Sequence, residues 1–310
     1  MSPDSAISIS RVSHRYGSRV AVNDLSLDIR PGEIFVFLGP NGSGKTTLFR
    51  LLSTLIPLQT GGVSILGRDV QQETVAVRAE LGVVFQAPSL DKKLTVAENL
   101  QHQARLYGLS KAEIQERSQQ MLATHGLADQ QNDRVETLSG GMRRRVELAK
   151  GMLHRPRLLL MDEPSTGLDP GARADLWQYL QEVRSEAGVT IVMTTHLLEE
   201  AAYADRIAIM HRGRLAALDT PAALQASVGG DSITLRTDHP EKLAESIRSQ
   251  FECEALVLDG TVRLEQPEGH RWISRLVEAF PDQIQSVILG KPTLEDVFID
   301  RTGHRYLNDQ

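Results

Sequence analysis

The part of this chain with the clearest chemistry is a glycine-rich run at residues 39–47 that fits the pattern G-x-x-x-x-G-K-[ST]. A strand-like apolar run precedes it, and a helix-like run follows it. In that context glycines let the backbone form a nest whose N–H groups face phosphate oxygens, Lys45 reaches the outer phosphates, and Thr46 offers a hydroxyl to Mg²⁺. The run therefore predicts a nucleoside triphosphate site. Its predicted members are Gly39, Pro40, Asn41, Gly42, Ser43, Gly44, Lys45, Thr46 and Thr47.

A second chemical feature is the acidic pair Asp162–Glu163, which directly follows the apolar run 158–161. A buried strand that ends in carboxylates places them where they can face the phosphate-binding loop. Mg²⁺ that bridges phosphates takes oxygen ligands, so Asp162 is the metal-side candidate. Glu163 is the next residue and can polarise an attacking water as a general base. The pair therefore adds hydrolysis to the predicted binding site.

The composition is that of an ordinary globular protein, with 310 residues of which 41% are hydrophobic and 24% charged. The formal net charge of −6 gives no overall attraction to nucleic acid or anionic lipid. Cys253 is the single cysteine, which excludes an internal disulfide and fits a reducing compartment. Nothing at the start resembles a signal peptide, and no run reaches the roughly 18 apolar residues of a membrane span. We therefore expect a cytoplasmic protein that needs a partner for any membrane role.

The apolar patterning predicts an α/β fold with a parallel sheet covered by helices. Residues 6–38 are predicted to form strands, and the last is uniformly apolar, which is typical of a strand buried on both faces. Residues 95–127 are predicted to be helical, with Ser110 and Glu113 spaced as a capping box. Further strands are predicted at 81–86, 157–164 and 190–196.

A composition change near residues 222–231, with small residues and adjacent glycines, indicates a domain boundary. We therefore expect one domain over 1–225 and a second over 226–310. The second shows strand, helix, strand, strand, helix and strand, which is the ferredoxin-like order. Its second helix carries the apolar stripe Trp272, Ile273, Leu276, Val277 and Phe280, which we expect to be core.

With LSGGM at 138–142 added to these features, the chain resembles the ATP-binding-cassette (ABC) ATPases over roughly residues 6–225. The resemblance implies a P-loop NTPase with a RecA-like parallel sheet, an antiparallel β subdomain and a helical signature subdomain. Every family motif occurs in the expected order. These are Tyr16 as the adenine-stacking aromatic, 39–47 as Walker A, Gln86 of the Q-loop, 138–142 as the signature, 157–164 as Walker B, Asp169 of the D-loop and His196 as the switch histidine.

The resemblance also implies roles for side chains outside the phosphate loop. Gln86 would sense Mg²⁺ and the attacking water while its loop touches a membrane partner, and His196 would contact the γ-phosphate. Asp169 precedes Pro170, which is typical of a helix N-cap, and the resemblance adds a role across a dimer interface. We expect the basic run Arg143–Arg145 to be a solvated helix face.

The signature implies a dimer. Ser139, Gly140 and Gly141 would bind the γ-phosphate of ATP held by the opposite subunit, because a helix N-terminus preceded by glycines suits phosphate. A complete site then needs two cassettes arranged head to tail, and this chain holds one. A homodimer is expected, with a heterodimer left open. ATP and Mg²⁺ are the implied cofactors, and ATP would close the dimer by a population shift.

Among ABC ATPases the resemblance favours transport. The helical stretch between Lys45 and Ser139 is short, whereas repair members insert long modules there, and the acidic balance argues against nucleic acid. Residues 89–100 and the tail 291–303 resemble the daunorubicin-type drug-resistance exporter ATPases, which are separate polypeptides that drive a membrane-spanning permease. This implies a subunit that powers export of a drug-like, lipid or other substrate. It would lie on the inner membrane face through its permease, with the tail serving dimerisation or regulation.

Two other functions stay open. An importer ATPase would use the ferredoxin-like tail to sense a small regulatory ligand, and that ligand would inhibit ATP hydrolysis. A soluble ATP-driven switch would work without a membrane partner. The transported substrate is not encoded in this chain, because specificity would reside in the membrane subunit.

Overall fold

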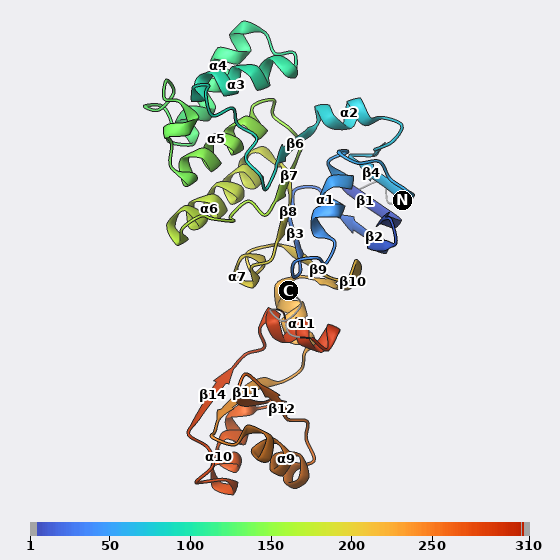
Figure 1. Ribbon diagram of the computed structural model, residues 1–310, viewed down its shortest axis with the longest axis vertical. Coiled ribbons are helices and arrows are strands. Elements are labelled where there is room, and N and C mark those ends of the chain that lie inside the picture. Colours follow the sequence, from blue (N-terminus) through green and yellow to red (C-terminus); the bar gives the residue numbers. More distant parts are fainter. Residues whose placement is uncertain (1–4, 305, 307–310) are drawn as a thin grey trace. The chain divides into compact units, whose positions relative to one another are not determined.

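The computed structural model describes residues 5–304 and 306, and the chain divides into two compact units (Figure 1). The first unit ends at Leu218, and the second begins at Asp219. The division therefore lies before the position between residues 225 and 226 that composition indicated. Among the described residues no helix is long and apolar enough to cross a membrane.

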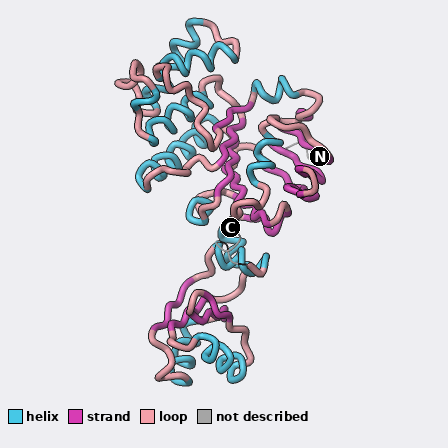
Figure 2. Tube along the Cα trace, viewed as in Figure 1, coloured by secondary structure: helices cyan, strands magenta, loops and turns pink. Residues whose placement is uncertain are grey.

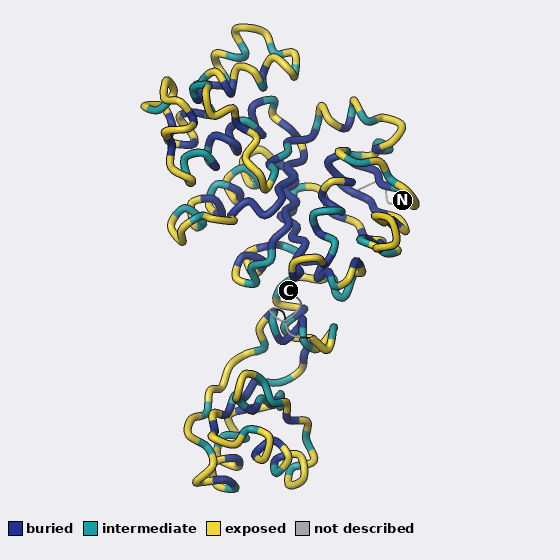
Figure 3. The backbone as a smooth tube through the Cα atoms, in the orientation of Figure 1, coloured by how far each residue is buried: buried dark blue, intermediate teal, exposed yellow. Residues whose placement is uncertain are grey.

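A six-stranded sheet forms the centre of the first unit, and Figure 2 shows its strands in magenta with helices on both sides. The pairs that join β9, β3, β8, β7 and β6 are all parallel, as predicted. Every residue of β3, β7 and β8 is buried, because other elements of the unit pack against both faces (Figure 3). The order is β10 (Arg214–Asp219), β9 (Arg206–His211), β3 (Ile34–Leu38), β8 (Thr190–Thr195), β7 (Leu158–Asp162) and β6 (Leu81–Val84).

A four-stranded antiparallel sheet packs beside this core in the first unit. Buried side chains of its strands, of helix α1 (Lys45–Leu52) and of β3 form one hydrophobic cluster. Helix α2 (Thr74–Ala79) follows this sheet and leads to β6. The sheet has the order β2 (Arg19–Ile29), β1 (Ile7–Tyr16), β4 (Thr60–Ile65) and β5 (Arg68–Asp69).

The helical part of the first unit has a hydrophobic cluster of its own. The predicted capping box of Ser110 and Glu113 is confirmed, and Thr95 and Glu98 form another. Both fix a helix start, because a side-chain oxygen accepts an N–H that the helix leaves unpaired. The helices are α3 (Val96–Leu106), α4 (Lys111–Thr124), the 3₁₀ turn Val135–Thr137 and α5 (Gly140–Met152), and α6 (Pro170–Ala187) and α7 (Leu198–Ala201) follow β7 and β8.

The second unit is a four-stranded antiparallel sheet with two helices packed against it. The order β12-β13-β11-β14 is that of a ferredoxin-like fold, as predicted. In the predicted apolar stripe Leu276 and Phe280 are buried, whereas Val277 is 42% exposed. The elements are β11 (Asp231–Arg236), α9 (Pro240–Phe251), β12 (Leu256–Leu258), β13 (Thr261–Gln266), α10 (Gly269–Ala279) and β14 (Ser286–Gly290).

Two further helices complete the second unit and explain where it begins. Helix α8 (Pro221–Ser227) packs against α11 (Leu294–Thr302), close to the end of the described chain. Arg301 Nη2 donates a 3.0 Å hydrogen bond to Ser227 Oγ in this contact. The unit therefore includes α8, which composition had placed in the first domain.

Candidate functional site

The glycine-rich run forms a tight loop between β3 and α1. Gly42 and Gly44 have φ angles of 82° and 105°, which glycine adopts freely and other residues avoid. A Cβ on Gly44 would lie 2.3 Å from the carbonyl oxygen of Ala21, and one on Gly39 would lie 2.4 Å from that of Met210. No side chain caps the start of α1, so its first N–H groups can serve phosphate oxygens. The loop therefore fits a polyphosphate.

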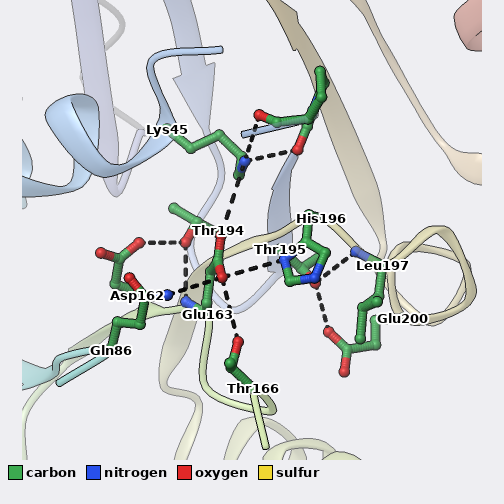
Figure 4. Close-up of polar contacts among 12 residues, drawn as sticks. Lys45, Gln86, Asp162, Glu163, Thr166, Thr194, Thr195, His196, Leu197 and Glu200 are labelled. Atoms are coloured by element: carbon green, nitrogen blue, oxygen red, sulfur yellow. Dashed lines mark hydrogen bonds and ion pairs between the residues drawn. The ribbon is translucent and has the colours of Figure 1, made fainter. Parts of the chain in front are cut away.

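Lys45 is buried in this loop, with 3% of its surface exposed. Its Nζ donates hydrogen bonds of 2.7 Å to the Gly39 carbonyl and 3.0 Å to the Pro40 carbonyl (Figure 4). It also lies 4.0 Å from Glu163 Oε1. Burial lowers the pKa of Lys45, and the negative charges of Glu163 and Asp162 oppose that shift. The ammonium group thus lies between the phosphate loop and the acidic pair, where it can neutralise phosphate charge.

Other loop members fall into two groups. Asn41, Thr46 and Thr47 line a cleft of about 420 Å³ together with Lys45 and Glu163. Ser43 is 3% exposed instead, and its N–H donates a 3.2 Å hydrogen bond to the Pro40 carbonyl. Its own carbonyl accepts a 2.9 Å hydrogen bond from the N–H of Gly213. Ser43 therefore holds the shape of the loop.

Side chains from three segments converge on the carboxylate of Glu163 (Figure 4). Gln86 Nε2 donates a 3.2 Å hydrogen bond to Glu163 Oε2, and Thr166 Oγ1 donates one of 3.3 Å. His196 Nδ1 lies 3.2 Å from the same oxygen. Gln86, Glu163 and His196 come from the ends of different strands, and the parallel sheet brings those ends to one edge. They are therefore placed to act on one reacting group.

The backbone of Glu163 is unusual, because its φ of 45° lies in the left-handed region that side chains disfavour. Its N–H donates to both the carbonyl (3.1 Å) and the hydroxyl (3.0 Å) of Thr194 on the neighbouring strand. These contacts hold the carboxylate in the cleft. Thr194, on a different strand, therefore stabilises the strained conformation of Glu163.

Asp162 and Thr46 carry the side-chain oxygen atoms that are the candidate ligands for Mg²⁺. Asp162 Oδ1 accepts a 2.6 Å hydrogen bond from Thr194 Oγ1. Burial raises the pKa of Asp162, and the Thr194 hydrogen bond opposes that shift. Thr46 lies in the first turn of α1, in the cleft beside Lys45. The Thr46 hydroxyl in the cleft and the carboxylate of Asp162, which precedes the cleft residue Glu163, are oxygen groups of the kind that Mg²⁺ prefers.

Tyr16 lies at the end of β1 and lines the same cleft. Its side chain is 46% exposed, and its ring packs edge-on against His14 at 4.9 Å between centroids. An exposed aromatic face next to a phosphate loop can stack on a base. The position fits the adenine-stacking role that the resemblance implies.

The signature residues lie elsewhere in the first unit. Ser139, Gly140 and Gly141 line a second pocket together with Asp169, and none of these four lines the cleft that contains Lys45. Ser139 Oγ accepts a 3.2 Å hydrogen bond from the N–H of Met142 and so caps α5. Asp169 Oδ1 accepts 3.0 Å from the N–H of Ala172, which confirms the N-cap expected before Pro170. The signature residues and the phosphate loop therefore line two separate pockets of one chain.

One charged residue of the site was not predicted. Arg144 was expected on a solvated face within Arg143–Arg145, but it is only 7% exposed and forms an ion pair with Glu147 at 2.8 Å. Its guanidinium group also donates to backbone carbonyls next to Gln86 and at Glu163. The signal in the sequence was the Arg–Glu spacing of three along a helix, which places both side chains on one face.

The parallel sheet, the phosphate loop and the acidic pair together define a nucleoside triphosphatase. Residues 22–166 match the model of the family described as ABC transporter. The chain is 35% identical to the daunorubicin resistance ATP-binding protein DrrA3 of Streptomyces coeruleorubidus, over 97% of this chain and 96% of that protein. It is also 35% identical to the Nod factor export ATP-binding protein I of Rhizobium johnstonii, over 96% of this chain and 95% of that protein.

Solved structures agree with the fold. A dimeric structure of a post-hydrolysis state of an ATP-binding cassette, bound to ADP and Pi, matches with a TM-score of 0.64 and 26% identity. The match covers 69% of this chain and 98% of that one. The chain therefore belongs to the ABC transporter ATP-binding proteins, which bind ATP and hydrolyse it to power transport. Proteins of this family dimerise and work with a transmembrane component.

Proposed function

We propose that this protein powers export of a drug-like or lipid substrate through a separate permease. Relatives named for drug resistance and for Nod factor export support export, because the similarity runs over 97% and 96% of this chain. The aligned region therefore includes the ferredoxin-like unit as well as the cassette. An importer subunit and a switch without a membrane partner are less favoured, since these relatives carry neither description.

The convergence of Gln86, Thr166 and His196 on Glu163, beside the phosphate loop, is the observation that carries the proposed mechanism. ATP would lie in the cleft with its adenine on Tyr16 and its phosphates on the loop N–H groups. Mg²⁺, bound by Thr46, Asp162 and Gln86 with the phosphates, would neutralise charge on the transferred group.

Glu163 is the proposed general base for the attacking water. Its carboxylate accepts hydrogen bonds from Gln86 and Thr166, which orient it, and it lies 4.0 Å from the Lys45 ammonium group. His196 Nδ1 lies 3.2 Å from Glu163 Oε2, and His196 is placed to contact the γ-phosphate. Proton removal from water and charge neutralisation by Lys45 are the two contributions that this chain makes to the step.

The second half-site belongs to the partner cassette in this proposal. Ser139, Gly140 and Gly141 at the start of α5 would bind the γ-phosphate held by the other subunit, with Asp169 across the interface. A homodimer needs no other chain, since both half-sites are present. The protein would then lie at the inner membrane face through its permease, and its second unit would serve dimerisation or regulation.

The test combines hydrolysis with copurification, using Glu163→Gln and the exposed Glu186→Gln as a matched control. Glu163→Gln should bind Mg²⁺–ATP normally and hydrolyse it about 10²–10⁴-fold more slowly, because the base is lost. Because it binds ATP and hardly hydrolyses it, Glu163→Gln should also copurify with a multi-span membrane protein from gently solubilised membranes. Normal turnover would remove Glu163 as the base, and an ATP-dependent dimer without a membrane protein would favour the switch.

A further inference from the structure

Arg144 has a buried guanidinium group that joins several segments of the site. Its Nη1 donates 2.9 Å to the carbonyl of Phe85, and its Nη2 donates 3.1 Å to the carbonyl of Glu163. Its Nε donates to the carbonyl of Pro164. Only arginine offers a planar set of donors that can satisfy such a set of carbonyls from one position.

Glu147 holds Arg144 in place from the next turn of α5. Its Oε2 accepts 2.8 Å from Arg144 Nη1, and its Oε1 accepts 2.6 Å from the N–H of Ser89. Lys150, one turn further on, donates 2.8 Å to the carbonyl of Ser89. One face of α5 therefore holds both ends of the loop 85–89, which contains Gln86.

The bonds to Phe85 and Glu163 lie next to functional side chains. Phe85 precedes Gln86, whose side chain donates to the Glu163 carboxylate at 3.2 Å. Glu163 needs external support, since its backbone is in the left-handed region. A buried charge is costly unless it is paired and hydrogen-bonded. Arg144 keeps its full set of hydrogen bonds only when the segments that contain Phe85 and Glu163 hold these positions relative to each other.

We propose that Arg144, oriented by Glu147, is a positioning residue for ATP hydrolysis that keeps Gln86 and Glu163 in register. It acts through the carbonyl of Phe85, which precedes Gln86, and the carbonyl of Glu163, and it makes no contact with the substrate. Ser139 caps the start of α5, so the helix that carries Arg144 also links the two proposed half-sites. The proposal rests on the proposed function of Glu163 as the base.

The test compares Arg144→Met and Arg144→Lys with the exposed Arg105→Met on α3, in the full chain. ADP affinity, measured by titration, should stay within about threefold of wild type in all three. The kcat for ATP should fall at least tenfold in Arg144→Met. It should recover little in Arg144→Lys, because a single ammonium group cannot bridge the carbonyls.

A wild-type kcat in Arg144→Lys overturns the proposal, and so does an equal loss of ADP affinity and kcat, which indicates a merely structural residue. If Arg144→Met does not fold, Glu147→Gln decides with the same assays, since it keeps the volume and removes the charge that orients Arg144. A several-fold loss of kcat is then expected, and an unchanged kcat contradicts the proposal. Glu163→Gln separates the two claims: if it is inactive while Arg144→Lys is fully active, only the positioning role fails.

Discussion

The hydroxyl of Thr194 donates a 2.6 Å hydrogen bond to Asp162 Oδ1, and it accepts the N–H of Glu163 at 3.0 Å. Asp162 and Thr194 are directly paired residues of the neighbouring parallel strands β7 and β8. One hydroxyl thus orients the proposed metal-side carboxylate and the backbone of the proposed base. Strand register, rather than sequence proximity, makes this contact.

Removal of that hydroxyl should weaken the response to Mg²⁺. Thr194→Val keeps the shape of the side chain but loses both hydrogen bonds, at a cost of about 1–3 kcal/mol in a buried site. We expect the Mg²⁺ concentration for half-maximal ATPase activity to rise at least threefold, and Thr194→Ser to behave as wild type. An unaltered Mg²⁺ dependence in Thr194→Val would contradict the proposed role of Asp162 in binding Mg²⁺.

Substitution of Gly44 by alanine should abolish tight nucleotide binding. The new Cβ would lie 2.3 Å from the Ala21 carbonyl oxygen, at a φ of 105°. We expect ATP affinity to fall more than tenfold in a binding titration, because the loop must open to relieve the clash. Gly108→Ala is the matched control, since Gly108 has a φ of 73° and no atom within 4 Å of a Cβ. Gly108→Ala should lose about 1 kcal/mol of stability and no ATP affinity. Equal losses of affinity in Gly44→Ala and Gly108→Ala would contradict the assignment of the phosphate loop.

The protein should lose stability in acid through His125. This residue is buried, its ring packs on Tyr179 at 4.4 Å between centroids, and burial lowers its pKa from 6.5 to about 4, with Arg145 adding to the shift. The folded state therefore keeps the imidazole neutral while the unfolded chain takes up a proton below pH 6.5. The contribution of neutral His125 to the free energy of unfolding is therefore complete above pH 6.5. It falls by about 3 kcal/mol as the pH drops to 4.

His125→Phe keeps an aromatic ring and removes the titration, so its unfolding free energy should depend less on pH between 7 and 4. The measurement is urea denaturation followed by Trp177, which is buried in the first unit, in a Trp272→Phe background. His102→Gln, at an exposed position on α3, should leave the pH slope unchanged. Equal slopes in wild type and His125→Phe would exclude His125 as the titrating group.

Truncation after Leu218 should leave a folded cassette. Leu218 packs against the hydrophobic core of the first unit and must stay, whereas α8 packs against α11. Circular dichroism melting and gel filtration should show one cooperative, monodisperse species that binds ATP. A chain that ends at residue 225 keeps most of α8 without its partner and should be more prone to associate. Aggregation of the shorter chain would show that the second unit completes the fold.

The amino-acid sequence by itself determined the features that depend on close neighbours along the chain. Glycines at 42 and 44 meet a local need for positive φ, and the N-caps at Ser110 and Asp169 act within one turn. The apolar run of β3 likewise encodes a strand buried on both faces. Such preferences are local, so the phosphate loop, the helix starts and the parallel sheet could be predicted.

Only the tertiary structure decided which distant residues meet. Arg144 belongs to a basic run that is typical of a solvated face, and carbonyls from Phe85 and Pro164 make its burial favourable. The division before α8 depends in the same way on α11, which lies far along the chain. The free energy of burying a charge or an apolar face depends on the groups that surround it in space, and no local pattern specifies those groups.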